Sequence, residues 1–224
     1  MSIKEEIIDY LIRNRVSTTE VADCLGKAGA LPGLVPCTSG LYRVGEVTWC
    51  YAYDESNWPL HKQIQNIEEG KIVLVSTNNC GDRAIFGELV SKYILLYNRC
   101  KAIVVDGKLR DAAALIREKW PIWCKGYTPM GCFNSTPEKA IDDEWVTYNR
   151  GLFEGTIAVC DDCGVVIIPH DCITVDFLDK LHRIEEQEDI WFDRLDHFKE
   201  NTFEIVCEKT YLNDELYMKR RIHR

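Results

Sequence analysis

Two short segments in the middle of the chain combine glycine with charged residues in a pattern that could bind an anionic ligand. The first is GDRAIFGELV, residues 81–90, in which Gly87 precedes Glu88 and a helix is expected to begin. The first amides of a helix have no acceptor within it, so those of Leu89 and Val90 favour an anion such as a substrate carboxylate. Taken alone, the segment is more simply an ordinary helix start in which Glu88 complements the helix dipole.

The second segment is VVDGKLRD, residues 104–111. A buried strand is expected to end at Asp106, and the adjacent Arg110 and Asp111 follow in the loop and at the start of the next helix. Loops at the carboxyl ends of strands in α/β sheets are common ligand sites. Arg110 can hold a carboxylate or enolate oxygen through two parallel hydrogen bonds, and Asp111 is a hard oxygen ligand for Mg²⁺. Taken alone, this pair is more simply a surface ion pair.

The elements that would position these residues are alternating helices and strands. The N-terminal residues 3–14 carry apolar side chains at helical spacing, and Ser17 to Glu20 form a capping box that starts a second helix near Thr18. Strands are expected at 41–53, 71–76, 101–106, 121–125, 155–160 and 164–168, and further helices at 59–69, from about 87, at 110–118 and at 174–199. This alternation predicts a single α/β domain of layered sheet and helices over residues 1–200, with 201–224 as an extension of uncertain structure.

The long C-terminal helix carries an apolar stripe at three- and four-residue steps, made of Leu178, Leu181, Ile184, Trp191, Leu195 and Phe198. Glu188 falls on this stripe, and Glu185 lies one turn away. A carboxylate buried on such a stripe has to be paired, metal-bound or protonated, because an unpaired buried charge is costly. The alternative is that the helix turns Glu188 to the rim of the stripe.

Composition sets the broad class of the protein. Of the 224 residues, 46% are hydrophobic and 28% are charged, which is the balance of a packed globular chain. No apolar run approaches the ~20 residues that span a bilayer, and the N-terminus lacks the pattern of a signal peptide. With a net charge of −9 and basic residues in a run only at 219–221, a nucleic-acid partner is not expected. We therefore expect a soluble, cytoplasmic protein.

The eleven cysteines are scattered and odd in number, which favours reduced cytosolic thiols over a disulfide framework. Cys160 and Cys163 form a CxxC pair, with His170 and Cys172 nearby, that could begin a zinc or redox site. A structural zinc site usually needs two such pairs, and the sequence has no second CxxC. This reading is the less favoured one, since buried cysteine commonly acts as a small hydrophobic residue.

Together, these segments make residues 17 to about 190 resemble the RraA-like family. That family includes the 4-hydroxy-4-methyl-2-oxoglutarate/4-carboxy-4-hydroxy-2-oxoadipate aldolases and the regulators of ribonuclease activity. The matching segments, in order, are STTEVAD at 17–23, GDRAIFGEL, KAIVVDGKLRD, GYTP at 126–129 and CDDCGVVIIP ending at Pro169.

The resemblance implies a fold and a set of residue roles. The fold would be a compact α/β/α sandwich that forms trimers or hexamers with sites between subunits. The amides of Leu89 and Val90, with the Arg110 side chain, would hold a pyruvoyl group, and Asp111 would bind Mg²⁺ or Mn²⁺ largely through ordered waters. Glu88 would hold a metal-bound water, although the family has Asp there with a spacing to the arginine one residue shorter. Finally, one acid, Glu188 or, as second choice, Glu185, would come from the C-terminal helix of a neighbouring subunit.

The activity implied is that of a divalent-metal-dependent carbon–carbon lyase acting on a small-molecule 2-oxo acid. Retro-aldol cleavage of 4-hydroxy-2-oxo acids and decarboxylation of oxaloacetate both pass through a pyruvate enolate, which a cation and Arg110 would stabilise. No lysine is placed for a Schiff base, since Lys108 is expected to face solvent. The alternative is a non-catalytic protein-interaction regulator, but the ribonuclease regulators lose the Arg–Asp pair that this chain keeps.

Overall fold

The computed structural model describes residues 1–213, and its centre is a seven-stranded mixed sheet. The strands lie side by side in the order β1-β5-β4-β3-β2-β6-β7. The four strands β2 to β5 run parallel to one another, whereas β1, β6 and β7 pair antiparallel with their neighbours. The strand bounds are β1 (Val35–Pro36), β2 (Arg43–Tyr53), β3 (Ile72–Asn78), β4 (Ala102–Val105), β5 (Ile122–Cys124), β6 (Ile157–Asp161) and β7 (Gly164–Ile168).

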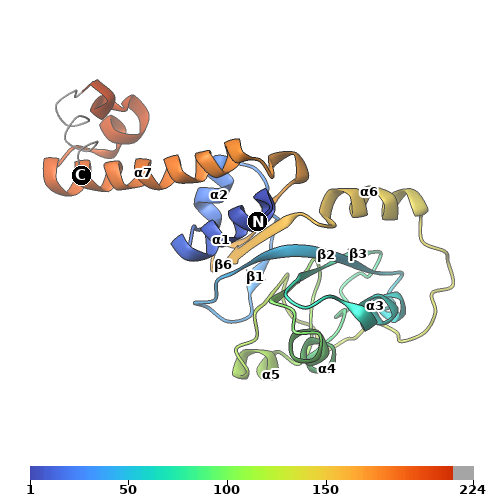
Figure 1. The fold of residues 1–224 in the computed structure, drawn as a ribbon. Helices are drawn as coiled ribbons and strands as arrows, with labels where there is room; N and C mark the ends of the chain where they lie inside the picture. The colour runs from blue at the N-terminus through green and yellow to red at the C-terminus, as the bar shows by residue number, and fades with distance from the viewer. Residues whose placement is uncertain (214–224) are drawn as a thin grey trace. The chain divides into compact units, whose positions relative to one another are not determined.

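Helices cover both faces of this sheet, as Figure 1 shows: α3, α4 and α5 lie on one side and α6 lies on the other. Helix α4 continues directly into a π-helix at Tyr93–Tyr97. The α-helices are α1 (Ile3–Asn14), α2 (Thr18–Cys24), α3 (Trp58–Gln63), α4 (Glu88–Lys92), α5 (Ala112–Arg117), α6 (Asp143–Phe153) and α7 (Val175–Phe198). Short 3-10 turns span Ile64–Asn66, His170–Cys172 and Thr210–Asn213, and a second π-helix spans Phe203–Glu208.

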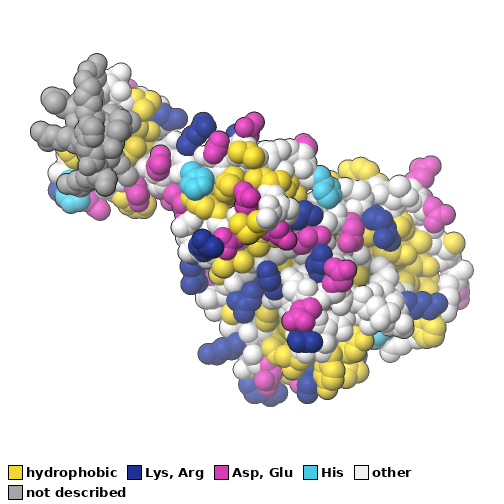
Figure 2. Space-filling view, viewed as in Figure 1, with side chains coloured by type: hydrophobic (Ala, Val, Ile, Leu, Met, Phe, Trp, Pro, Cys, Tyr) yellow, Lys and Arg dark blue, Asp and Glu magenta, His cyan; other side chains and the backbone are white. Residues whose placement is uncertain are grey.

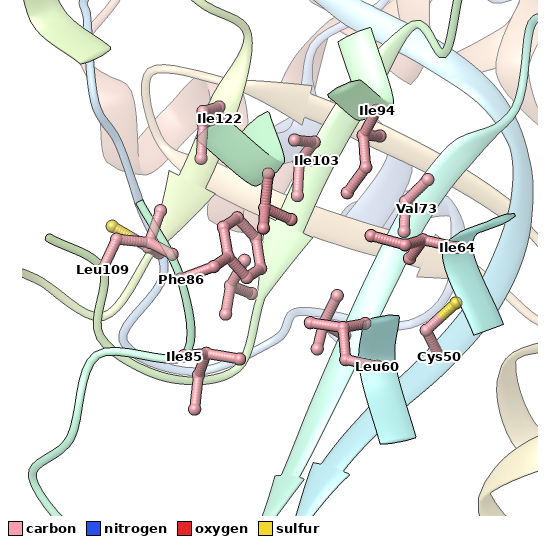
Figure 3. Close-up of a cluster of buried hydrophobic side chains, with 14 of the residues drawn as sticks. Cys50, Leu60, Ile64, Val73, Ile85, Phe86, Ile94, Ile103, Leu109 and Ile122 are labelled. Atoms are coloured by element: carbon pink, nitrogen blue, oxygen red, sulfur yellow. The ribbon is translucent and has the colours of Figure 1, made fainter. Parts of the chain in front are cut away.

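The central strands are buried on both faces, so their sequences are continuous apolar runs. Along β3, Val73 and Val75 pack into the cluster beneath α3, α4 and α5, while Ile72 and Leu74 pack on the opposite face with the side chains of α6. Figure 3 shows the first of these clusters, to which Leu60 contributes from α3. The predicted α/β layering with helices on both faces of the sheet is confirmed.

The chain divides by its internal packing into residues 1–177 and 178–224. The whole sheet belongs to the first unit. The second unit contains most of α7 and the short helices after it, with a hydrogen bond from Trp191 Nε1 to the Tyr211 hydroxyl of 3.3 Å and an ion pair between Arg194 and Glu200. The division lies within α7, earlier than the boundary at residue 200 expected from the sequence, and the range 1–200 stays a prediction.

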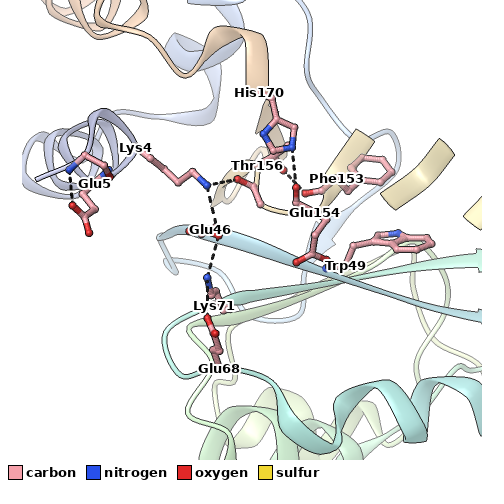
Figure 4. A network of polar contacts seen from close by, with 12 residues as sticks. Lys4, Glu5, Glu46, Trp49, Glu68, Lys71, Phe153, Glu154, Thr156 and His170 are labelled. Atoms are coloured by element: carbon pink, nitrogen blue, oxygen red, sulfur yellow. Dashed lines mark hydrogen bonds and ion pairs between the residues drawn. The ribbon is translucent and has the colours of Figure 1, made fainter. Parts of the chain in front are cut away.

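The N-terminal helices are fixed to the sheet by local caps and by polar contacts. The capping box predicted at Ser17 is present: Ser17 Oγ accepts from Glu20 N at 3.2 Å, and Glu20 accepts from Ser17 N at 2.7 Å. At the other helix, Lys4 Nζ donates to Gly155 O at 2.7 Å and lies 3.6 Å from Glu46 Oε1 (Figure 4). Glu46 also pairs with Lys71 at 3.0 Å, which joins α1 to β2 and to the residue before β3.

Two predicted helices differ from the structure in their bounds. The helix predicted at 110–118 begins only at Ala112, and the helix predicted at 59–69 ends by Asn66 after a change to 3-10 geometry. Strand β1 and helix α6 have no counterpart among the predicted elements. The basic run 219–221 lies outside the described residues.

The surface of the described residues carries mixed charge. Figure 2 shows acidic and basic side chains interspersed over the visible face, with apolar side chains between them. Among residues 1–213, no helix is both long and apolar enough to cross a bilayer.

Candidate functional site

Three loops meet at the carboxyl ends of the parallel strands β3, β4 and β5. They span residues 79–87, 106–111 and 125–133, and they pair with one another much as strands do. Ala84, in the first loop, bridges to Lys108 and Gly131 in the other two. Because ligands of α/β sheets commonly bind at this edge, the loops place the predicted residues where chemistry is expected.

Two buried side chains anchor the loops beneath the site. Phe86 and Leu109 both project into the core below α3, α4 and α5 (Figure 3), and their exposures are 2% and 0%. The Arg110 amide donates to the Phe86 carbonyl at 3.0 Å, which joins the two loops directly. The residues after each anchor, Gly87 and Arg110, consequently lie close together: a Cβ built on Gly87 would lie 2.7 Å from Arg110 Cγ.

Asp111 has an unusual backbone conformation that aims its carboxylate at a neighbouring helix. Its φ is 61°, in the left-handed region that non-glycine residues seldom adopt. Although Asp111 is the N-cap of α5, its side chain does not cap that helix. Instead, Asp111 Oδ2 accepts from the Glu88 amide at the start of α4, at 2.9 Å. Strained backbone of this kind persists where surrounding contacts over-determine it and is common at functional sites.

Arg110 and Asp111 form an open pair and not a buried one. Arg110 Nε lies 3.9 Å from Asp111 Oδ2, and the two side chains are 52% and 45% exposed. About half of each polar group therefore remains available to a ligand. A buried, locked ion pair would have been incompatible with the predicted role.

Five of the site residues proposed from the sequence belong to the first unit: Glu88, Leu89, Val90, Arg110 and Asp111. Glu88 is the first residue of α4, and Leu89 and Val90 follow it in the turn whose amides have no acceptor inside the helix. The contact between Asp111 and the Glu88 amide brings these residues next to Arg110. Their chemical roles stay predictions. The two segments, 81–90 and 104–111, do lie next to each other in the structure.

Two glycines lie against the side chains of this site: Gly87, which the sequence analysis placed at the start of a helix, and Gly131, which it did not single out. A Cβ at Gly87 would lie 2.0 Å from Asp111 Oδ2 and 2.7 Å from Arg110 Cγ, and one at Gly131 would lie 2.9 Å from Arg110 Nη1. Neither glycine has a φ in the left-handed region, so the backbone itself does not require glycine. At Gly87 the lack of a side chain is needed by the packing of Asp111 and Arg110, whereas at Gly131 an added methyl group would press only on the flexible end of Arg110.

The donor set suits a hard divalent cation held partly by water. Within residues 1–213, no group of three or more His, Cys, Asp or Glu side chains is arranged to hold a metal ion. Asp111 and Glu88 supply two carboxylates, and Mg²⁺ is commonly bound by one or two carboxylates plus waters. Among the described contacts, Asp111 Oδ1 accepts no hydrogen bond, so this oxygen is the one left for a cation.

Glu188 and Glu185 belong to α7 in the second unit, where both side chains are partly buried and both interact with other groups. The apolar stripe predicted on this helix is buried at Leu181, but Leu195 and Phe198 are 39% and 51% exposed. The role predicted for the two glutamates involves a neighbouring subunit and stays a prediction.

The remaining candidates occupy different environments. Lys108 Nζ donates to Asp82 at 2.8 Å, and this hydrogen bond lowers the pKa of the Asp82 carboxyl. Cys160 is fully buried in the sheet, where burial raises the pKa of its thiol, whereas Cys163 is exposed in the following turn. The two thiols of the CxxC pair therefore lie in a dry core and in solvent, respectively.

Comparisons with known proteins agree on the family. The RraA-like model, described as Aldolase/RraA, matches residues 18–167. Protein DlpA of Legionella pneumophila is 24% identical over 172 residues, which cover 70% of this chain, and the chain spans about a quarter (26%) of that protein's length.

Two solved structures share the fold. An uncharacterized protein from Pseudomonas syringae pv. tomato superimposes with a TM-score of 0.69 at 21% identity, over 91% of this chain and 98% of the other. Streptomyces coelicolor RraAS2, described as an unusual member of the RNase ES inhibitor RraA protein family, gives 0.63 at 23% identity, over 83% and 94%. On the extent of the family match and this fold, the chain belongs to the RraA-like (Aldolase/RraA) family.

Proposed function

We propose that the protein is a divalent-metal-dependent carbon–carbon lyase that cleaves 2-oxo acids through a pyruvate enolate. The observation that carries this proposal is the open pair of Arg110 and Asp111, half exposed beside the first turn of α4. Both side chains lie at the edge of the sheet where ligands of α/β proteins commonly bind, so Arg110 would stabilise the negative charge and Asp111 would bind the cation.

Different groups of the chain would bind different parts of the substrate. The amides of Leu89 and Val90 would receive the carboxylate of the pyruvoyl group, since they point out of the helix without acceptors. Arg110 would donate to the ketone oxygen as negative charge develops on it. Removing one such donor typically costs ~3 kcal/mol, or roughly a hundredfold in rate.

Asp111 would hold Mg²⁺ or Mn²⁺ largely through ordered waters, and Glu88 would hold a metal-bound water. When bound, the cation supplies Lewis-acid stabilisation of the charge that gathers on the ketone oxygen. The hydrogen bond from the Glu88 amide holds one oxygen of the Asp111 carboxylate in place.

Two reactions share the electron flow that this site would favour. In retro-aldol cleavage, the bond between the carbon beside the ketone and the hydroxyl-bearing carbon breaks, its electrons form the enolate, and the hydroxyl proton leaves through water. In oxaloacetate decarboxylation, the same enolate forms as carbon dioxide leaves. Water then protonates the enolate carbon to give pyruvate, so no lysine is required.

The assembly proposed is a homotrimer or hexamer in which Glu188 or Glu185 of a neighbouring subunit completes the site, and the location proposed is the cytoplasm. Light scattering should report a trimer or its multiple, and dissociated monomers should be inactive. A monomeric, fully active protein would show that the site needs no glutamate from a neighbouring subunit.

A non-catalytic regulatory role is the competing proposal, because the similar Streptomyces protein is described within an RNase inhibitor family. The presence of Arg110 and Asp111 in an open geometry favours catalysis instead. A purely regulatory protein would release no pyruvate from any 2-oxo acid.

The test is a panel of 4-hydroxy-2-oxo acids and oxaloacetate, assayed with the wild type, Arg110→Ala and Asp111→Ala. Both variants should lose turnover while keeping the circular dichroism of the wild type, because both side chains are largely solvent-facing. Arg117→Ala is the matched control, since Arg117 is 67% exposed on α5 and pairs only with its neighbour Glu118 among the described residues. Unimpaired turnover by Arg110→Ala would contradict the proposal.

A further inference from the structure

Arg83, in the first of the three site loops, is held on three sides. Its guanidinium carbon lies 4.4 Å from the centre of the Phe133 ring, and its Nε lies 3.0 Å from Glu55 Oε2. Its Nη1 donates to the Gly131 carbonyl at 3.1 Å. With 19% of its side chain exposed, Arg83 joins the loop after β2 to the loop after β5.

The main chain of the partner residue, Glu55, is itself held in place. Asp54 and Glu55 are consecutive residues in the left-handed region, with φ of 52° and 57°. Such conformations are unfavourable for non-glycine residues and persist only when neighbouring contacts impose them. Here Glu55 N donates to Asn79 O at 3.0 Å, and its carbonyl accepts from Phe133 N at 2.8 Å. Glu55 is therefore a fixed point to which Arg83 is tied.

Gly131 contacts an arginine on each side. Its carbonyl receives Arg83, while its Cα faces Arg110: a Cβ built there would lie 2.9 Å from Arg110 Nη1 and 3.6 Å from Arg110 Cζ. Any shift of this main-chain segment changes the surface on which the Arg110 guanidinium rests. Because Arg83 is paired with Glu55, Arg110 is the arginine of the two that remains open to an anion.

We infer that Arg83 is a positioning residue for Arg110 and acts through the main chain at Gly131. This inference rests on the proposed function, in which Arg110 stabilises the enolate. Arg83 does not touch the substrate; it holds the segment against which the Arg110 guanidinium packs.

The expected effect falls mainly on kcat. A misplacement of about 1 Å at a reacting centre can cost ~10²-fold, and Arg110 itself is still present when Arg83 is replaced. Arg83→Met should therefore lower kcat about tenfold with KM changed little, since Arg110 acts on charge that develops in the transition state. Arg83→Lys keeps the charge beside Glu55 and should recover part of the loss.

A double-mutant cycle separates positioning from general destabilisation. If Arg83 acts through Arg110, Arg83→Met should add little further loss in an Arg110→Lys background. An independent structural role predicts the same fold-loss in both backgrounds. Arg99→Met is the matched control, because Arg99 is 71% exposed and pairs only with Glu69 among the described residues; it should leave kcat unchanged.

A binding measurement keeps the inference distinct from the lyase proposal. Oxalate, a planar dianion that resembles an enolate of pyruvate, is titrated calorimetrically in the presence of Mg²⁺, and Arg83→Met should weaken its binding about tenfold. The wild type could bind oxalate but turn over no substrate, while Arg83→Met binds oxalate more weakly. That result would support the positioning role of Arg83 and contradict the lyase proposal. If the wild type is active and Arg83→Met has the same kcat and the same oxalate affinity, the positioning role of Arg83 is overturned and the lyase proposal is not.

Should Arg83→Met fail to fold, Glu55→Gln provides a milder release of the same guanidinium. It should lower kcat several-fold without a change in KM. Wild-type kcat and wild-type oxalate affinity in folded Glu55→Gln and Arg83→Lys would overturn the inference. A wild type that neither turns over nor binds oxalate would overturn both proposals.

Discussion

Replacing Gly87 with alanine should disable the site while leaving the fold in place. Gly87 has a φ of −143°, outside the left-handed region, so the main change on substitution is the added methyl group. That methyl would lie 2.0 Å from Asp111 Oδ2 and 2.7 Å from Arg110 Cγ, and ordinary contact begins near 3.4 Å. Both side chains must therefore retreat, the carboxylate by roughly 1 Å or more.

The cost can be estimated from the contact that is lost. The hydrogen bond from the Glu88 amide to Asp111 Oδ2, 2.9 Å long, cannot survive such a shift. A hydrogen bond to a charged group contributes ~1.5–3 kcal/mol, and because Asp111 is 45% exposed the figure expected here is about 1 kcal/mol. Turnover should fall further, by roughly a hundredfold, since a displacement of about 1 Å affects both Arg110 and Asp111.

Urea denaturation and steady-state kinetics on oxaloacetate measure the two effects. The urea midpoint should fall by about half a molar or less. Gly151→Ala is the matched control: Gly151 lies in α6 with no heavy atom within 4 Å of the added methyl, so alanine should stabilise the helix by ~0.5–1 kcal/mol and leave turnover unchanged. Wild-type turnover and midpoint in Gly87→Ala would refute the claim that the site depends on this close packing.

Three further predictions concern the cap, a buried thiol and the metal. Ser17→Ala should lower the free energy of unfolding by about 1 kcal/mol, because it removes the acceptor of the Glu20 amide; an unchanged urea midpoint would contradict this. Burial raises the pKa of Cys50 to about 12, so its contribution to stability is fully present below the unfolded thiol's value of about 8.5 and is lost as the pH rises towards 12. Cys50→Ala should accordingly flatten the decline of stability between pH 8 and 10, measured by urea unfolding under reductant, and an unaltered slope would exclude this thiol as its source. Glu88→Gln should raise the Mg²⁺ concentration for half-maximal activity several-fold with little change in turnover at saturating metal; an unshifted metal titration would remove Glu88 from the metal's surroundings.

The sequence predicts those parts of the fold that local patterns specify. Continuous apolar runs are required by strands buried on both faces, so β3 and β4 could be located closely. The capping box at Ser17 defines a helix start through residues three apart. Glu88 and Arg110 could be grouped because both of their segments carry the resemblance to the RraA-like family.

Features that depend on distant contacts could not be read in this way. Residues from Arg110 onward have helical character, yet Asp111 adopts a left-handed conformation in which its carboxylate meets an amide 23 residues earlier in the chain. Strand β1 has only two residues, and α6 buries none of its residues fully, so neither leaves a strong periodic signal. The roles of Gly131 and Arg83 depend on a main-chain segment that only tertiary structure brings to Arg110.

Pyruvate release from oxaloacetate, measured with Mg²⁺, then with EDTA and then after Mg²⁺ is restored, tests the central claim most directly. If Arg110 and a cation held near Asp111 together stabilise the enolate, release should be clear with Mg²⁺, vanish with the chelator and return with the metal. Release that is insensitive to EDTA, or no release under any of the three conditions, would contradict it.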